Sequence, residues 1–428
     1  MSMKPLALAV STFAAALALA DVCVEDIKCT QRYPWNGLVD IEYTIACDDP
    51  DAEIYVNPVG YNGDTGLTVF PTHFTGDGAT NTVKAGKHKM VWDARADMGL
   101  FASKNFQIKM YAGKTLAPYV VVDLSSGPDG ENFPIRYSLT GPDISDDACR
   151  TTELWLRLIP PGTFMMGSPA DELGRYDNED LHKVTITQPF YIGVFEVTYE
   201  QYYRVKGSWM RFGNQAQTYP VEWVRYSASW ENADYDGGYA GTVRGDAGTY
   251  PPLGTTVHGS TFFGILRAKT DFNGFDLPTE AQWEYACRLG TTTALNDGSN
   301  LEGITGSKNL NVLGRYYANG TQGEQKLGEG ADKSMAKVGS YKPNAYGIYD
   351  MHGNVAELCR DIWSEHLGFT ACVDPLVSTA SYNDVVIRGG AWDVGAGLCR
   401  SSTRRKINQN SMSHSVGFRI SCPGNLQK

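Results

Sequence analysis

The sequence predicts an α+β protein in which an all-β, immunoglobulin-like sandwich is followed by a larger, loop-rich domain. Short segments that alternate apolar and polar residues recur between residues 21 and 115, as in antiparallel strands. Two helix capping boxes occur after residue 151, and long Gly-, Asn- and Asp-rich loops separate them. The length of 428 residues suits two domains.

The first twenty residues have the pattern of a secretory signal peptide. Lys4 precedes a mostly apolar run from Leu6 to Leu19, and the run ends in Ala18-Leu19-Ala20. A short basic region, an apolar segment and an A-x-A end are typical of such peptides, so we expect cleavage after Ala20. The run is shorter than a comfortable membrane span, and no later stretch approaches 18 apolar residues. We therefore expect a secreted or cell-surface protein without a membrane span.

The segment 21–115 is expected to form the sandwich. Predicted strands cover residues 39–45, 54–56, 82–83, 88–92 and 105–111, with turn signals such as Asn36-Gly37 between them. Cys23, Cys29 and Cys47 lie in this segment, and in an exported protein we expect one disulfide among them. Nothing in it has a catalytic pattern, so we interpret it as a structural domain.

Residues 116–150 are interpreted as a connector with one possible strand at 119–122. The larger domain then covers residues 151–424. It opens with predicted strands at 154–159 and 183–187.

Two helices of the larger domain are predicted from capping boxes. One begins at Thr198 and the other at Thr279, each with Gln three residues later. In the second helix Trp283, Ala286 and Cys287 fall on one face, which we expect to be buried.

The charge and cysteine counts narrow the function classes. Lys and Arg total 37 against 48 Asp and Glu, and no basic run is longer than three residues. Sequence-independent nucleic-acid binding needs a basic face, so we exclude it. The nine cysteines lie after the signal sequence, and no two of them form a C-x-x-C pair. This absence argues against a redox-active dithiol site and against a zinc site with the usual cysteine spacing.

From about residue 151 onward the chain resembles the formylglycine-generating-enzyme family, also called the sulfatase-modifying-factor domain. The resemblance rests on five ordered blocks, at 159–168, 190–198, 277–286, 343–357, and 388–392 followed by 417–419. It implies an irregular relative of the C-type lectin fold.

The resemblance also implies calcium. A family site would use Asp350 and Glu357 through their side chains and Gly353 and Val355 through their carbonyl oxygens, an all-oxygen set suited to Ca²⁺. The alternative is that Asp350 and Glu357 are loop-capping or salt-bridged carboxylates. A weaker second site would use Asn319 and the carbonyl of Gly320.

The resemblance breaks at the catalytic centre. The family's oxidases bind copper through two cysteines after the Arg-Gly-Gly motif, and this chain has Val394 and Cys399 at those positions. One thiolate does not complete a Cu(I) site, so we consider copper unlikely and lean towards a protein that is not an enzyme. Cys399 would be catalytic only in an enzyme. The family's fold brings it near Cys359, and we expect a Cys359–Cys399 disulfide, with Cys287 as the free thiol.

A binding role is the main alternative to catalysis. In related bacterial surface proteins the stretch matching residues 391–416 displays variable residues. Here we expect ligand contacts from Trp392, Asp393, Arg400, Arg404, Asn408 and His414. We therefore expect a secreted recognition or structural protein with an unknown protein or glycan ligand, and self-association is a further hypothesis. The alternative is a secreted metal-dependent oxidoreductase of the same family.

Overall fold

The structure is a computed structural model. It describes residues 22–33, 36–99, 103, 105–208, 217–227, 241–245, 257–320, 335–378 and 383–426. The chain divides into two compact units. Unit 1 runs to Pro118 and also takes 137–140 and 160–164, and unit 2 contains the rest. None of the described helices is both long and apolar enough to cross a membrane.

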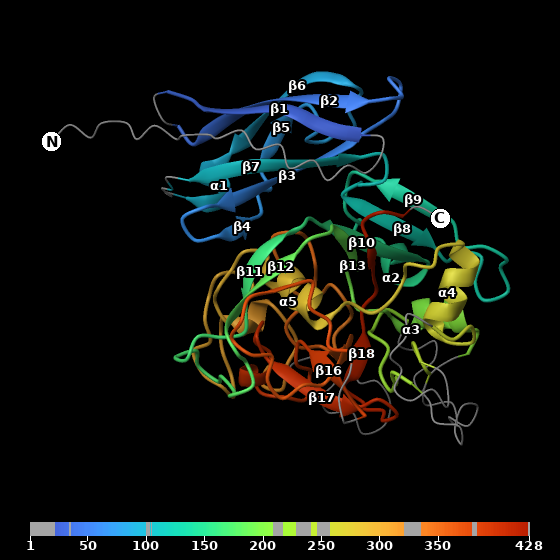
Figure 1. The fold of residues 1–428 in the computed structure, drawn as a ribbon. Helices are drawn as coiled ribbons and strands as arrows, with labels where there is room; N and C mark the ends of the chain where they lie inside the picture. The colour runs from blue at the N-terminus through green and yellow to red at the C-terminus, as the bar shows by residue number, and fades with distance from the viewer. Residues whose placement is uncertain are drawn as a thin grey trace. The chain divides into compact units, whose positions relative to one another are not determined.

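Unit 1 is an all-β sandwich of two antiparallel sheets (Figure 1). One sheet has the order β1-β2-β6-β5 and the other β4-β3-β7. The strands are β1 (Val22–Gln31), β2 (Leu38–Cys47), β3 (Tyr55–Asn62), β4 (Leu67–Val69), β5 (Phe74–Gly76), β6 (Gly86–Asp93) and β7 (Phe106–Gly113), and the short helix α1 (Ala94–Met98) follows β6.

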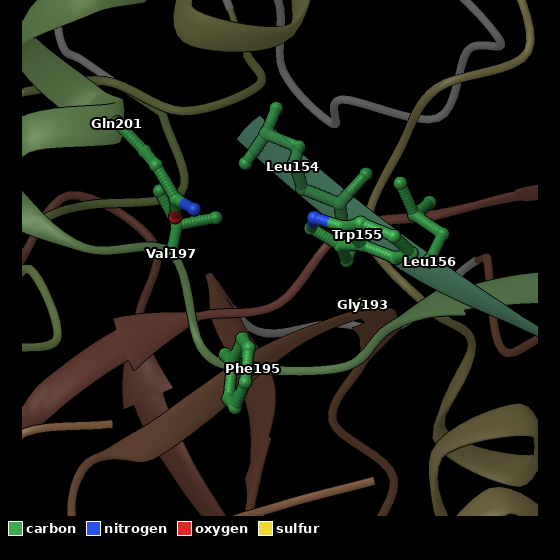
Figure 2. A pocket seen from close by; sticks show the side chains of 8 residues that line it. Leu154, Trp155, Leu156, Gly193, Phe195, Val197 and Gln201 are labelled. Atoms are coloured by element: carbon green, nitrogen blue, oxygen red, sulfur yellow. The ribbon is translucent and has the colours of Figure 1, made fainter. Parts of the chain in front are cut away.

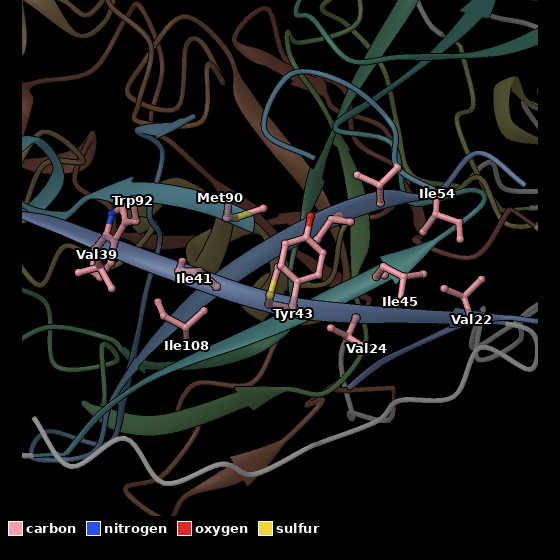
Figure 3. Packing of buried hydrophobic residues seen from close by; sticks show 14 of the residues in the cluster. Val22, Val24, Val39, Ile41, Tyr43, Ile45, Ile54, Met90, Trp92 and Ile108 are labelled. Carbon is pink, nitrogen blue, oxygen red and sulfur yellow. The ribbon is translucent and has the colours of Figure 1, made fainter. Parts of the chain in front are cut away.

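The sandwich core lies between the two sheets, as Figure 3 shows. Ile41 and Trp92 from one sheet pack in the same cluster as Ile108 from the other. The alternating pattern of 39–45 is confirmed, because Val39, Ile41, Tyr43 and Ile45 are all buried. Strand β1 was not predicted from the sequence, and around residues 82–83 there is only an isolated bridge between Ile54 and Val83.

The predicted disulfide within the sandwich is not formed, since Cys23, Cys29 and Cys47 are free in the structure. The strand register gives the reason. Cys47 lies opposite Val22 and Cys29 lies opposite Ile41, towards the core, while Cys23 lies opposite Ala46 on the other face. Cys23 therefore faces away from the other two, and Cys29 and Cys47 lie at different ends of the strand pair.

The remaining strands, β8 to β19, form three further sheets (Figure 1). Their orders are β19-β13-β10-β8-β9, β11-β12-β15 and β17-β16-β14-β18. The strands are β8 (Tyr119–Asp123), β9 (Ile135–Ser138), β10 (Glu153–Ile159), β11 (Gly162–Met166), β12 (His182–Ile186), β13 (Phe190–Gly193), β14 (Ala356–Ile362), β15 (Cys372–Val373), β16 (Asp384–Arg388), β17 (Arg404–Asn408), β18 (Val416–Phe418) and β19 (Ser421–Pro423).

The helices of unit 2 are short, and long loops connect them. They are α2 (Ala148–Thr151), α3 (Tyr199–Lys206), α4 (Phe262–Thr270), α5 (Glu280–Arg288) and the 3₁₀ turns η3 (Leu310–Val312) and η4 (Ala396–Leu398). Both predicted capping boxes are confirmed, at Thr198 for α3 and at Thr279 for α5. The predicted inner face of α5 is also confirmed, because Trp283, Ala286 and Cys287 have no exposed surface.

Candidate functional site

The loop that carries the predicted calcium ligands leads directly into strand β14. Asp350, Gly353 and Asn354 have φ angles of 58°, 90° and 59°. Glycine is required at 353, since a Cβ there would lie 2.0 Å from the main-chain oxygen of Arg315. Asn354 donates its N–H to that same oxygen at 2.7 Å. The loop therefore has one closely fitted conformation.

Glu357 is held by side chains from two other elements. The parallel pairing of β14 with β18 places Leu358 opposite Phe418, next to Arg419. Arg419 donates to both carboxylate oxygens, at 2.7 and 2.9 Å, and the indole N–H of Trp283 donates to Oε2 at 2.7 Å. All three side chains are buried. Glu357 is thus a salt-bridged carboxylate, as the alternative interpretation expected.

Glu196 is a third carboxylate in this region, and the sequence analysis did not single it out. Its oxygens accept from the Val355 main-chain N–H at 3.0 Å and from the Asn354 amide at 2.6 Å. Burial, together with the charges of Asp350 and Glu357, raises the pKa of Glu196 well above its ordinary value. Its position in the 190–198 block was the available signal, but its partners lie about 160 residues later in the chain.

Asp350 is the predicted calcium ligand with a free oxygen. Its Oδ2 accepts from the Gly339 N–H at 2.6 Å, whereas no donor among the described residues reaches the buried Oδ1. Burial raises the pKa of this carboxyl to about 6. Within the described part of the chain, no three His, Cys, Asp or Glu side chains converge as a metal site. Asp350 has a free oxygen for a cation, whereas both oxygens of Glu357 already accept hydrogen bonds, so calcium stays a prediction.

The weaker second calcium site has less room for a cation. The side chain of Asn319 closes a local turn, accepting from Tyr316 N–H at 2.8 Å and donating to Gly314 O at 2.8 Å. The guanidinium of Arg315 donates to the Asn319 carbonyl oxygen at 2.7 Å. A cation here would face that positive charge. Gly320 follows in the same turn, and the acidic residue near it in sequence, Asp332, lies outside the described residues.

Cys399 is the one cysteine at the two positions where the resemblance implies copper ligands. Its side chain has no exposed surface and packs with Leu310, Leu313 and Ala396, and Val394 packs against the same cluster. Burial raises the pKa of the Cys399 thiol to about 12. The sulfur is therefore a protonated thiol at neutral pH.

The predicted Cys359–Cys399 disulfide is absent from the structure, where both cysteines are free. Cys359 lies in the middle of β14, and its thiol donates to the main-chain oxygen of Glu357. Cys399 points into the separate apolar cluster around Leu310. Cys287 is free and buried as expected, but it is not the single leftover thiol, because all nine cysteines are free.

Two residues predicted to contact a ligand are instead internal. Arg400 has no exposed surface and forms ion pairs with Glu172 and Glu179, both at 2.6 Å. Arg404 is also buried, and it pairs with Glu280 at 2.6 Å. These guanidiniums fix loops and strands of unit 2, and they are not available to a ligand.

The other residues of this set reach the surface. Trp392 and Asp393 are half-buried, and Asn408 and His414 are exposed. His414 lies 5.4 Å from Trp392 between ring centres and 6.1 Å from Trp223, while its Nε2 lies 3.1 Å from Asp393 Oδ2. We call Trp223, Trp392, Asp393 and His414 the aromatic cluster. Asn408 lies at the end of β17, where its side-chain oxygen accepts from the Asn410 N–H at 3.1 Å. Trp223 is the member that the sequence analysis missed.

A small pocket lies elsewhere in unit 2, beside strand β10 (Figure 2). Its lining residues are Leu154, Trp155, Leu156, Gly193, Phe195, Val197, Gln201 and Ile420. Gln201 is the polar side chain of this lining that could orient a ligand, but its amide group already donates to the carbonyl oxygens of Cys149 and Glu153. None of the predicted site residues lines this pocket.

The comparison with protein families decides the assignment of unit 2. A model described as "Sulfatase-modifying factor enzyme 1-like domain" matches residues 144–422. The chain belongs to this family. The resemblance of the five sequence blocks is thereby confirmed.

Several relatives of this sulfatase-modifying-factor domain are named formylglycine-generating enzyme. The formylglycine-generating enzyme of Thermomonospora curvata is 31% identical over an alignment of 225 residues that covers 48% of this chain and 71% of that protein. The enzyme of the same name from Mus musculus is 26% identical, over 61% of this chain and 73% of its own. Among solved structures, PvdO from Pseudomonas aeruginosa is 24% identical with a TM-score of 0.46, covering 63% of this chain and 94% of that one.

In this sulfatase-modifying-factor domain, hydrogen bonds join all five sequence blocks. Gly167 donates to Glu284 at 2.9 Å, and Arg388 also pairs with Glu284. The bonds of Glu196 to Asn354 and of Trp283 and Arg419 to Glu357 connect the other blocks. The blocks therefore define a buried polar framework, which explains why they predict the fold well.

Proposed function

We propose that this protein is a secreted or cell-surface recognition protein whose sulfatase-modifying-factor domain binds a protein or glycan ligand without catalysing a reaction. The observation that carries this proposal is the state of the copper-ligand positions. Val394 cannot supply a thiolate, and Cys399 is a fully buried thiol whose pKa is raised to about 12. A domain that keeps the framework but lacks this metal-binding pair keeps a rigid surface for binding.

The surface of residues 391–416 supports a recognition role. Arg388, Arg400 and Arg404 are buried in ion pairs, which makes the strands and loops below this surface rigid. Trp392, Asp393 and His414 present aromatic and charged groups above them. Half-exposed aromatic side chains on a rigid base are typical of recognition sites. Calcium, held by Asp350 with the carbonyl oxygens of Gly353 and Val355, is part of the proposal as a structural ion.

The competing function is that of a secreted metal-dependent oxidoreductase, which the names of the relatives favour. The first test separates the two by chemistry. The purified protein is incubated with copper, a thiol reductant, oxygen and a cysteine-containing peptide, and the peptide is followed by mass spectrometry. We expect no formylglycine in the product, with or without copper. Conversion of the peptide cysteine by the wild-type protein would contradict the proposal.

The second test measures the reactivity of Cys399 itself. The reduced native protein is treated with iodoacetamide at pH 8, and labelling of each cysteine is followed by peptide mass spectrometry. We expect Cys399 to react at least about 100-fold more slowly than Cys23, because only the thiolate of an accessible cysteine is alkylated. Cys23 lies on the outward face of an edge strand and serves as the matched control. Equal rates would show an accessible thiolate and would favour the oxidoreductase.

A further inference from the structure

Three arginine side chains of unit 2 gather around a single carboxylate, that of Asp276. Arg244 donates to both carboxylate oxygens, at 2.7 and 3.2 Å. Arg267, on helix α4, donates to Oδ2 at 3.4 Å, and the Nε of Arg360, on strand β14, lies 3.8 Å from the same oxygen. The three guanidinium groups therefore share one small region, which we call the arginine cluster.

The charges of the arginine cluster do not balance. Three guanidinium groups face one carboxylate, so two positive charges are left in excess. Among the described residues, no carboxylate other than Asp276 pairs with Arg267 or Arg360. Burial lowers the pKa of Arg267, Asp276 acts in the opposite direction, and the charges of Arg244 and Arg360 lower it further. Like charges held this close together favour the binding of a counter-ion.

Asp361, the residue after Arg360, does not supply the missing charge. Its two oxygens accept from main-chain N–H groups, of Glu280 at 2.6 Å and of Val377 at 3.0 Å. Burial raises the pKa of Asp361 to about 7, so a large part of this carboxyl is uncharged near neutral pH. Successive side chains of a strand also point to opposite faces, which directs Asp361 away from Arg360.

Arg267 and Arg360 are positioned in advance of any ligand. The Nε–H of Arg267 donates to Phe275 O at 2.7 Å, which fixes the plane of its guanidinium. The main chain of Arg360 is held on both sides, because its N–H donates to Pro278 O at 2.8 Å and its carbonyl oxygen accepts from the Tyr226 hydroxyl at 3.2 Å. A ligand that binds groups held in this way loses less free energy in ordering them.

The arginine cluster is open to solvent on the side of Arg360. The side chain of Arg360 is 28% exposed and that of Arg267 is 15% exposed, whereas that of Arg244 is only 1% exposed. Within the part of the chain that the structure describes, the Arg360 guanidinium makes no hydrogen bond, and its one ion-pair partner is Asp276 at 3.8 Å. Its N–H groups are therefore available to a ligand from solution.

We propose that Arg267 and Arg360, supported by the charge of the buried Arg244, bind an oxoanion that carries two negative charges. Sulfate and phosphate groups share this chemistry, and guanidinium groups donate paired hydrogen bonds to their oxygens. Two negative charges match the excess of the cluster, whereas a neutral sugar would leave it uncompensated. The arginine cluster lies outside residues 391–416, so the inference does not depend on the recognition function proposed for that surface.

The inference is tested with anions that differ in charge. Titration calorimetry at pH 7.5 and constant ionic strength compares sulfate with methanesulfonate, in which a methyl group replaces one oxygen and one negative charge is lost. We expect sulfate to bind roughly tenfold more tightly. Inorganic phosphate is titrated in parallel, and the tighter of the two dianions identifies the preferred group. If neither dianion binds more tightly than methanesulfonate, the inference is overturned.

Binding is measured directly because sulfate also stabilises folded proteins by its exclusion from their surface. Arg360→Gln is expected to weaken sulfate binding at least about tenfold, whereas Arg360→Lys retains it within about threefold. Arg267→Gln should weaken it to a similar degree, and circular dichroism verifies that each variant is folded. The control is Arg136→Gln, since Arg136 is 48% exposed and pairs with Glu153 outside the cluster. Unchanged sulfate binding in Arg360→Gln and Arg267→Gln, or an equal loss in Arg136→Gln, would contradict the assignment.

Discussion

The Glu357–Arg419 pair shows how single residues hold this domain together. Both side chains are fully buried, and the guanidinium makes two hydrogen bonds to the carboxylate. Arg419 also donates to the carbonyl oxygens of Gly193 and Tyr349, at 2.8 and 2.9 Å. The pair thus connects strand β14 with strand β13 and with the loop before Asp350. A buried charge without its partner is costly, so neither residue is replaceable alone.

Replacing Arg419 by Met is expected to lower the free energy of unfolding by roughly 3–5 kcal/mol. The change leaves Glu357 buried without a counter-charge, next to Glu196 and Asp350. Urea denaturation followed by near-UV circular dichroism measures the loss. The control is Asp177→Asn, which removes an exposed ion pair with Arg175 and should change stability by less than about 0.5 kcal/mol. A loss for Arg419→Met no larger than that of the control would contradict this role.

The roles of the buried arginines could not be predicted from the sequence. Arg400 and Arg404 stand in a segment with polar, surface-like composition, which led to their assignment as ligand contacts. Glu179 lies 221 residues before Arg400, and Glu280 lies 124 residues before Arg404. No local pattern reports a partner at such a separation. Trp392 and His414, which were predicted as ligand contacts, do reach the surface, and their role in ligand binding stays a prediction.

At the scale of elements, helix α5 and strand β14 are joined through Asp361. Its Oδ2 accepts from the main-chain N–H of Glu280 at 2.6 Å, in the first turn of α5. Its Oδ1 accepts from the Val377 N–H at 3.0 Å. Burial, with a further contribution from the charge of Glu280, raises the pKa of Asp361 to about 7, while Arg404 acts in the opposite direction. One buried carboxyl therefore connects a helix, a strand and a loop.

The raised pKa of Asp361 predicts that the free energy of unfolding depends on pH. The folded protein keeps the Asp361 proton up to about pH 7, whereas the unfolded chain loses it near pH 4. Unfolding between these values releases a proton, so the stability from this group is complete below about pH 4 and falls as the pH rises to 7. The slope is at most about 1.4 kcal/mol per pH unit. Urea titrations from pH 4.5 to 7.5 measure it.

The comparison variant is Asp361→Asn, which cannot ionise. The difference in unfolding free energy between wild type and variant should shrink with rising pH, because only the wild type loses stability through this group. Thr279→Ala serves as the control. It removes the neighbouring cap of α5, should cost about 1 kcal/mol, and should leave the slope unchanged. Parallel pH profiles for wild type and Asp361→Asn would contradict the assignment.

The elements were predicted where their signals are local. Helices α3 and α5 carry complete capping boxes, and both were predicted. Helix α4 was missed. Its cap, Thr261, is followed by Gly264 at the third helical position instead of Glu or Gln, so the box is incomplete. Strand β1 was also missed, because its exposed central residues interrupt the alternation that predicts a strand.

At the scale of the whole molecule, the sequence blocks of the family describe a framework rather than an activity. They were sufficient to predict the family, because they supply the buried carboxylates, arginines and indoles that hold unit 2 together. The residues that would carry the family's copper chemistry lie outside this framework. They can therefore change while the fold persists, as Val394 and the buried Cys399 indicate.

Calcium provides the test of the framework as a whole. If Asp350 binds Ca²⁺ through its free oxygen, the ion stabilises unit 2. Scanning calorimetry at pH 7.5 should show a rise in the Tm of unit 2 of roughly 5 °C at a hundredfold excess of Ca²⁺ over its Kd, with reversal by EDTA. Asp350→Asn should abolish the rise, whereas Asp51→Asn, an exposed carboxylate of unit 1, should not. Identical Tm values in Ca²⁺ and EDTA would exclude calcium as a structural ion of this domain.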